Sequence, residues 1–307
     1  MRFEKPPLTI GEQVELLLSR GMTGDTACIA NRLAMANYYR LSGYWYPFRT
    51  EESTFRPGTC FEQIWKRYTF DRHLRLLVMD ALERIEITLR TQFAYHHAHS
   101  HGPFAYTDDP KSLPKLNTAD WHKFQTRLLE EIERSREPFM THFRKTYGAD
   151  HPAPPIWCAI EVISFGSLVT LYRNATRKVK KAVADVFGVP PEVLESWILS
   201  LNTVRNLCAH HGRLWNKVLG LKPRIPLQEQ YPEWHQPVSI GPERVFGILT
   251  ICKHCLDRIA PQSQWPNRLT QLLARYPEIP IAEMGFPENW QESLIWKMKE
   301  GGSGYGG

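Results

Sequence analysis

The sequence predicts an all-α fold, and three observations support this prediction. Apolar residues recur at three- and four-residue steps through most of the 307-residue chain, as they do on the buried face of a helix. Capping residues, prolines and glycines stand at the ends of these periodic segments. No series of alternating polar and apolar residues indicates a strand or a hairpin of strands. The length suffices for one large domain or two smaller ones.

The chain begins with a predicted helical hairpin in residues 1–50. A capping-box pattern at 9–12 starts its first helix, and Asp25 caps its second helix, which we expect to end near Gly43. A long helix at 61–99 follows, because neither Pro nor Gly interrupts its apolar pattern. It is expected to form the central spine of the fold.

The remaining helices belong to a domain predicted at residues 51–300, with a possible internal boundary at the Pro-rich stretch 151–155. We expect these helices at about 118–136, with Thr118 as the cap, and at 139–147, 156–174, 177–187, 190–211, 243–259 and 268–275. The tail at 301–307 has the composition of a flexible linker and is left outside the fold.

Composition places the protein among ordinary globular proteins. Charged residues make up 23% and hydrophobic residues 42%, a balance that excludes disorder over most of the length. No apolar stretch approaches the roughly 20 residues that a membrane-spanning helix needs. The first residues lack the apolar core of a secretion signal, and the six cysteines follow no disulfide pattern. We therefore expect a cytoplasmic protein with reduced thiols and without a membrane partner.

Basic charge is concentrated in one part of the chain. The net charge is +6, but residues 172–224 alone carry ten Lys or Arg against three acids. A solvated helix face is one explanation for the basic residues near its start. A path for RNA is the favoured explanation, because this stretch continues into the segment at 203–216. The candidate RNA contacts here are Arg177, Lys178, Lys180 and Lys181.

The segment at 203–216 holds the residues most suited to chemistry. It places Arg205 and His210 five positions apart near the end of a predicted helix. Imidazole exchanges protons near neutral pH, and guanidinium matches the charge and shape of a phosphate. These groups are suited to RNA cleavage, in which a ribose 2′-OH loses a proton and the leaving 5′ oxygen gains one. Such a scheme needs neither a metal nor another cofactor.

Helix geometry leaves a second interpretation open. Five residues at about 100° each separate Arg205 and His210 by roughly 140° around an ideal helix. A long side chain, a loosened last turn near Gly212 or a partner subunit must therefore bring the two groups together. Alternatively, His210, His211 and Arg213 only satisfy the carbonyls at the helix end. The residue types alone do not decide between these interpretations.

Five blocks of sequence resemble, in order, the Abi-like family of abortive-infection proteins (AbiD and AbiF type), which belongs to the HEPN superfamily of helical ribonucleases. The blocks are Asn37–Tyr44 with Pro47-Phe48, Tyr68–Arg75 with Ile85–Arg90, Pro155–Glu161 with Ser164–Ser167, Val204–Asn216, and Met284–Trp290. Together they extend the resemblance over about residues 5–297. In that superfamily the motif is Arg, four to six residues, then His, usually with a polar residue after the Arg; Arg205, Asn206 and His210 fit it.

The resemblance implies a fold, an activity and partners. The fold would be a HEPN-type helical bundle with accessory C-terminal helices. The activity would be metal-independent RNA cleavage by an antiphage toxin, with Arg205, Asn206 and His210 as catalytic residues and a cyclic phosphate or 3′-phosphate product. A homodimer or a higher homo-oligomer would build the site from two chains, and a noncoding RNA would restrain it. Further candidate RNA contacts are His211, Arg213, Asn216 and Lys217. The alternative is a HEPN-fold RNA-binding module without cleavage activity.

Other candidate sites have simpler explanations. Arg90, followed by His96 and His97, repeats the Arg-to-His spacing, but an intrahelical ion pair with Glu86 explains Arg90 more simply. Either residue could still line the site, so Arg90 stays a candidate RNA contact. The histidines at 96–101 are interpreted as a solvated helix end rather than a metal site. The Cys-x2-Cys at 252–255 has no second pair and is interpreted as two buried thiols.

Overall fold

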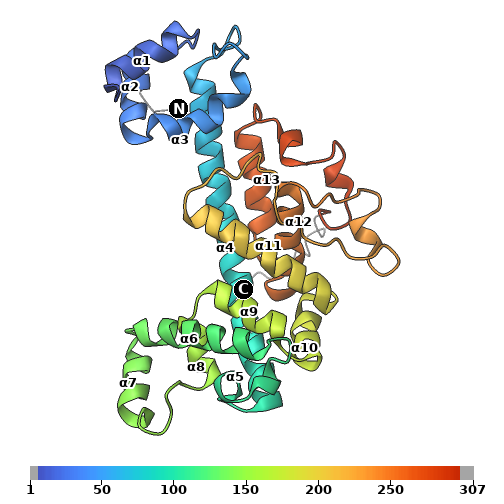
Figure 1. Ribbon diagram of the computed structural model, residues 1–307. Coiled ribbons are helices and arrows are strands. Elements are labelled where there is room, and N and C mark those ends of the chain that lie inside the picture. Colours follow the sequence, from blue (N-terminus) through green and yellow to red (C-terminus); the bar gives the residue numbers. More distant parts are fainter. Residues whose placement is uncertain (1–5, 298–307) are drawn as a thin grey trace, which may run out of the picture. The chain divides into compact units, whose positions relative to one another are not determined.

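The computed structural model describes residues 6–297, and the prediction of an all-α fold is confirmed for them: they form thirteen α-helices, short 3₁₀ turns and no strand (Figure 1). The α-helices are α1 (Ile10–Ser19), α2 (Thr26–Met35), α3 (Tyr38–Trp45), α4 (Phe61–His101), α5 (Ala105–Asp108), α6 (Thr118–Arg134), α7 (Pro138–Tyr147), α8 (Ile156–Val162), α9 (Phe165–Asn174), α10 (Arg177–Phe187), α11 (Pro191–Ala209), α12 (Val245–Ile259) and α13 (Trp265–Arg275). Within residues 6–297, no helix is long and apolar enough to cross a membrane.

The described residues form two compact units. The first contains residues 6–75 and 269–280, and the second contains 76–268 and 281–297. A compact unit of this kind need not fold independently. The domain boundaries expected from the sequence, at residue 50 and near 151–155, therefore stay predictions.

The first unit contains the N-terminal helices, and both predicted caps are confirmed. Thr9 Oγ1 accepts the Glu12 N–H at 3.3 Å while the Glu12 carboxylate accepts the Thr9 N–H at 2.7 Å, and Asp25 Oδ1 accepts the Cys28 N–H at 2.7 Å. The prediction that the second helix runs on to Gly43 is wrong. The chain leaves the helical conformation at Ala36, and Asn37 starts α3 by accepting the Tyr39 N–H at 2.9 Å.

A buried polar group lies at the centre of the first unit. Asp71 is fully buried and accepts a hydrogen bond from the Tyr44 hydroxyl at 2.6 Å and from Arg75 Nη1 at 2.5 Å. Burial raises the pKa of Tyr44 well above its usual range, and the Asp71 carboxylate raises it further. These contacts tie α3 to the first part of α4.

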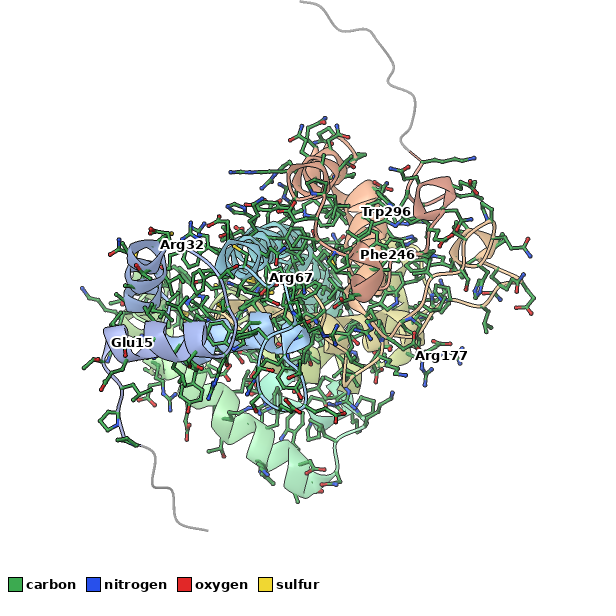
Figure 2. All side chains as sticks on the ribbon, turned by 90° about the horizontal axis from the view of Figure 1, so that it is seen from above. Glu15, Arg32, Arg67, Arg177, Phe246 and Trp296 are labelled. Atoms are coloured by element: carbon green, nitrogen blue, oxygen red, sulfur yellow. The ribbon has the colours of Figure 1, made fainter. Side chains whose placement is uncertain are left out.

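The core of the second unit is built around α12. Its residues from Val245 to Leu256 are buried on every side, and it packs against α10, which also packs against α11 (Figure 1). The rings of Phe246 and Trp296 stack at 5.9 Å between centroids (Figure 2). The predicted pair of buried thiols is confirmed, since Cys252 and Cys255 are free and buried in this helix, and burial raises the pKa of both.

The predicted helix at 156–174 is two helices, so that prediction is wrong. α8 ends at Val162, and Ser164 begins α9 by accepting the Ser167 N–H at 3.2 Å. Glu131 on α6 fixes this break, because its carboxylate accepts hydrogen bonds from the Ser164 N–H at 2.9 Å and from the Ser167 hydroxyl at 3.0 Å. The break therefore depends on a contact between distant parts of the sequence.

The other predicted helices are confirmed with small shifts. The spine at 61–99 is α4, which extends to His101. The cap of α6 is Asn117 rather than Thr118, because the Asn117 side chain accepts the Asp120 N–H at 2.8 Å. Helices α12 and α13 begin within about three residues of the expected positions, as is usual for helix ends.

Replacing Asp71 should destabilise the protein strongly. In Asp71→Ala the Arg75 guanidinium stays buried without its counter-charge, so we expect the free energy of unfolding to fall by about 3–5 kcal/mol. The matched control is Asp185→Ala, which removes an exposed (i, i+4) partner of Lys181 and should change stability by about 0.5 kcal/mol or less. Chemical denaturation measures both variants. Equal losses in the two would contradict a special role for the buried group.

Candidate functional site

Helix α11 carries the Arg-to-His motif. Its buried side chains recur at helical spacing and include Val204 and Cys208, on either side of Arg205 along the chain. Arg205 is half-buried and Asn206 is exposed. The last helical residue is Ala209, so His210 occupies the C-cap with φ −87° and ψ 14°.

Main-chain hydrogen bonds close the end of α11. The Gly212 N–H donates to the Leu207 carbonyl at 2.8 Å, and the His211 N–H donates to the Cys208 carbonyl at 3.0 Å. This pairing is a Schellman motif, with His211 in the left-handed conformation at φ 57°. A Cβ atom at position 212 would lie 2.3 Å from Leu207 Cδ1, so the close approach favours glycine.

This closure concerns the interpretation in which the histidines only satisfy the carbonyls at the helix end. The His210 N–H donates to the Asn206 carbonyl at 3.0 Å, so the carbonyls of Asn206, Leu207 and Cys208 all accept main-chain N–H groups. These three carbonyls do not need an imidazole for capping. His210 and His211 project from the helix end as exposed side chains.

Arg205 lies in a cavity of about 500 Å³ between α11 and α4. Its Nε is buried, has no hydrogen-bond partner among residues 6–297, and lies 3.8 Å from Glu86 Oε2. Its Nη1 lies 3.4 Å from Asn206 Oδ1. The charged groups lining the cavity are Asp80, Glu83, Glu86, Arg90 and Arg205, so acids outnumber bases.

Arg90 lines the same cavity and has a structural role. The predicted ion pair with Glu86 is confirmed, at 2.5 Å between Arg90 Nη2 and Glu86 Oε1. Arg90 Nη1 also donates to the carbonyls of Ile160 and, at 3.0 Å, Ile163, where α8 ends. Arg90 therefore caps α8 from within the protein and holds Glu86 beside Arg205.

Arg205 and His210 do not line a common cavity in the single chain. The cavity that contains Arg205 is lined from α4 and α11, and His210 is not among its lining residues. The composite site built from two chains stays a prediction.

The residues after the helix end are held against the C-terminal part of the second unit. Asn216 is half-buried, with its Nδ2 3.4 Å from Glu283 Oε2, and its carbonyl accepts a hydrogen bond from Arg244 at 3.2 Å. Trp215 is fully buried. Arg213 is half-buried and Lys217 is exposed. Lys217 is therefore the most accessible of the candidate RNA contacts that follow Gly212.

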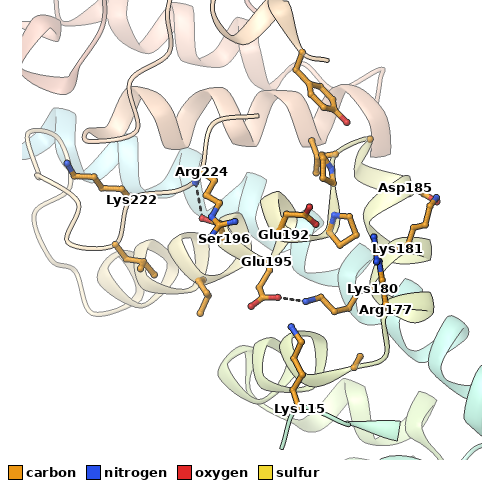
Figure 3. A pocket seen from close by; sticks show the side chains of 18 residues that line it. Lys115, Arg177, Lys180, Lys181, Asp185, Glu192, Glu195, Ser196, Lys222 and Arg224 are labelled. Atoms are coloured by element: carbon orange, nitrogen blue, oxygen red, sulfur yellow. Dashed lines mark hydrogen bonds and ion pairs between the residues drawn. The ribbon is translucent and has the colours of Figure 1, made fainter. Parts of the chain in front are cut away.

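The basic residues of α10 divide between the surface and the interior. Arg177, Lys178 and Lys181 are exposed, whereas the Lys180 side chain is buried and forms an ion pair with Glu195 of α11 (Figure 3). Arg177, Lys180 and Lys181 line a second, larger cavity together with Lys115. Lys115 was missed in the sequence, because no local pattern links it to a helix that begins more than sixty residues later.

The histidines at 96–101 differ in their surroundings. The interpretation as a solvated helix end is wrong for His97, which is fully buried with neither ring nitrogen hydrogen-bonded to the residues that the structure describes. Burial and, to a smaller extent, nearby His101 lower the pKa of His97 to about 4. Among residues 6–297, no group of three or more His, Cys, Asp or Glu side chains is placed to hold a metal ion.

The fold and the site define a class of protein: a helical protein in which a half-buried arginine precedes an exposed histidine pair at a helix end. The chain matches the family of Abi-like proteins over residues 31–216, more than half of its length, and it belongs to this family. The match ends at Asn216, so the block Met284–Trp290 lies outside it. No curated protein and no solved structure matches the chain. Membership of the Abi-like family implies a role in abortive-infection defence against phage.

Replacing His97 should make the protein less sensitive to acid. An unfolded histidine takes up a proton below about pH 6.5, whereas His97 resists protonation until about pH 4, so the folded state loses stability as the pH falls between these values. His97→Phe should therefore remove about 2 kcal/mol of the stability loss between pH 7 and pH 5. Denaturation at both pH values measures this difference. An unchanged pH dependence in the variant would contradict the assignment.

Replacing His211 by glycine should stabilise the protein. The left-handed conformation costs a residue with a side chain about 1 kcal/mol that glycine does not lose, so the free energy of unfolding of His211→Gly should rise by about that amount. His211→Ala is the control, because it removes the imidazole but keeps the conformational cost. Thermal unfolding compares the two, and equal stability would show that the left-handed conformation carries no cost.

Proposed function

We propose that this Abi-like protein is a metal-independent endoribonuclease toxin of an abortive-infection system, with Arg205 and His210 as its catalytic residues. One observation carries the proposal. The main chain closes the end of α11 by itself, which leaves the two histidines exposed within five or six residues of a half-buried arginine. The exposed His210 side chain is therefore not needed for capping, and in this proposal it takes part in the chemistry.

The proposed reaction is an attack by the ribose 2′ oxygen on the adjacent phosphorus. A base takes the 2′-OH proton as the new P–O bond forms, and an acid gives a proton to the 5′ oxygen as its bond to phosphorus breaks. The products are a 2′,3′-cyclic phosphate and a 5′-hydroxyl. His210 supplies one of the proton-transfer groups, and a second imidazole comes from His211 or from the second chain of a dimer.

Arg205 is suited to binding the charged phosphate. Its Nε faces Glu86 and its Nη1 contacts Asn206 Oδ1, and in this proposal the terminal Nη groups contact the phosphate. A guanidinium held in this way stabilises the charge that grows on the phosphate oxygens during attack. Asn206 is exposed beside it, where its amide is suited to orienting His210 or contacting phosphate. A homodimer that pairs two α11 ends would bring Arg205 of one chain to His210 of the other.

The proposal extends to regulation. The basic surface of α10 and the exposed residues after α11 are the proposed RNA contacts, and a noncoding RNA partner would restrain the toxin by occupying them. The alternative is an RNA-binding module that acts by sequestering RNA. The observation that favours this alternative is that His210 does not line the cavity that contains Arg205.

Arg205→Ala and His210→Ala should abolish RNA cleavage and growth arrest. Loss of a positioned acid or base, or of a phosphate-stabilising charge, lowers such rates by about 10²–10⁴-fold. Arg136→Ala and His122→Ala are matched controls, because both side chains are exposed and lie outside the site. Cleavage of total RNA in EDTA, with end analysis of the products, measures the effect.

Three outcomes of this experiment are informative. Activity that disappears in EDTA would contradict a metal-independent mechanism. Equal activity and toxicity in wild type and both site variants would contradict the assignment of Arg205 and His210. RNA binding without cleavage by any version, including wild type, would favour the RNA-binding module.

A further inference from the structure

A second cavity of the second unit lies away from Arg205. It is an open groove of about 1000 Å³ between α10, the first half of α11 and the loop at residues 221–231, and Lys115 reaches into it from another segment (Figure 3). Its charged lining residues are Lys115, Arg177, Lys180, Lys181, Lys222 and Arg224, against Asp185, Glu192 and Glu195. Bases therefore exceed acids by three.

The floor of the groove, which Lys115, Lys180 and Glu195 line, carries surplus positive charge. Glu195 forms an ion pair with buried Lys180 and also approaches Arg173, at 3.5 Å between Arg173 Nε and Glu195 Oε1. Burial opposes ionisation of Glu195, but Lys180, Lys115 and Arg173 outweigh it and lower the pKa of this carboxyl. One carboxylate is thus shared among three cations.

Lys115 also disfavours the charge of Lys180. Burial lowers the pKa of Lys180, Glu195 raises it, and the neighbouring Lys115 lowers it again. A bound anion between these ammonium groups would remove this repulsion. The floor is therefore suited to an anionic ligand that neutralises more charge than Glu195 does.

We propose that this groove anchors a strand of RNA through its phosphates, at a distance from Arg205 and His210. The inference rests on the proposed function for the choice of RNA. Both sites are on α11, since Glu195 and Ser196 line the groove and Arg205 follows about ten residues, or roughly 15 Å, further along the helix. A strand lying in the groove would extend along α11 toward the proposed cleavage residues.

Size and chemistry favour a strand over a smaller anion. The volume is at the upper end of small-molecule pockets, and the cations are spread along the lining instead of converging on one point. Arg177 and Arg224 are exposed guanidinium groups, which bind phosphate in a bidentate manner. Leu199, Leu221 and Tyr231 add apolar and aromatic surface on which bases pack.

The test is RNA binding by a triple variant, Lys115→Ala/Arg177→Ala/Arg224→Ala, in the His210→Ala background, which prevents cleavage. All three side chains are exposed, so the fold should persist, whereas buried Lys180 and its half-buried partner Glu195 are left intact. The probe is a fluorescein-labelled single-stranded RNA of mixed sequence and about 20 nucleotides. We expect the affinity for this RNA to fall more than about tenfold. The slope of log K against the logarithm of salt concentration should become shallower by about two, because three phosphate contacts are lost.

The matched control is Lys123→Ala/Arg134→Ala/Arg136→Ala in the same background. It removes one exposed lysine and two exposed arginines from α6 and its end, outside the groove. This variant should keep the salt dependence of the parent. Equal losses in the two triples, or no RNA binding by the parent, would overturn the proposal. Displacement of the labelled RNA by an equal concentration of AMP would also overturn it, because the groove would then be a mononucleotide pocket.

Cleavage assays distinguish this proposal from the proposed function. They use the same substitutions in a chain that keeps His210. If both hold, the groove triple raises KM and keeps kcat, whereas Arg205→Ala loses kcat. If the wild type does not cleave RNA and the groove triple still loses RNA binding, the proposed role of the groove is supported and the proposed nuclease function is contradicted. If the wild type cleaves RNA and the groove triple has the same KM, the proposed nuclease function is supported and the proposed role of the groove is contradicted.

Discussion

The buried ion pair between Glu86 and Arg90 determines how the candidate site is assembled. Arg90 satisfies the carbonyls of Ile160 and Ile163 at the end of α8, and Glu86 faces Arg205 on α11. One (i, i+4) pair on α4 therefore connects three helices. Buried ion pairs contribute little net stability compared with apolar packing, but removing one partner leaves an uncompensated charge. The positions of α8 and Arg205 are for this reason linked through a single group on α4.

Local signals in the sequence predicted most of the helices, and contacts between distant residues explain the errors. The caps at Thr9 and Asp25 involve side chains within three residues of their partners, so the sequence contains all the information needed. The break between α8 and α9 is different, because Glu131 fixes it by hydrogen-bonding to Ser164 and Ser167. The sequence shows Ser164 as a possible cap, but it does not show that a carboxylate from α6 reaches it.

The candidate site was likewise predictable where it depends on one segment, and not where it depends on contacts between distant residues. Arg205, Asn206 and His210 belong to one segment, and their positions on the helix follow from helical geometry. The acid-rich surroundings of Arg205 depend on α4, and the groove depends on Lys115 lying near Lys180. Those contacts join parts of the chain that no short-range pattern connects. His97 gave a misleading signal, because a run of histidines at a helix end resembles a solvated surface while one member of it is buried.

The uneven distribution of charge gives a physical reason for separating the proposed RNA-binding groove from the proposed cleavage residues. The net charge of +6 is too small to attract RNA to the whole surface, and the cavity around Arg205 has more acids than bases. A phosphate beside Arg205 is attracted by the guanidinium and repelled by the acids, so affinity there is small, and a gain in rate requires the charge that grows on the phosphate oxygens to lie closer to the guanidinium than to the carboxylates. An interaction that strengthens only in the transition state raises the rate, and affinity supplied elsewhere does not oppose it. The cationic groove on the first half of α11 can supply that affinity, so the acids around Arg205 are compatible with RNA cleavage.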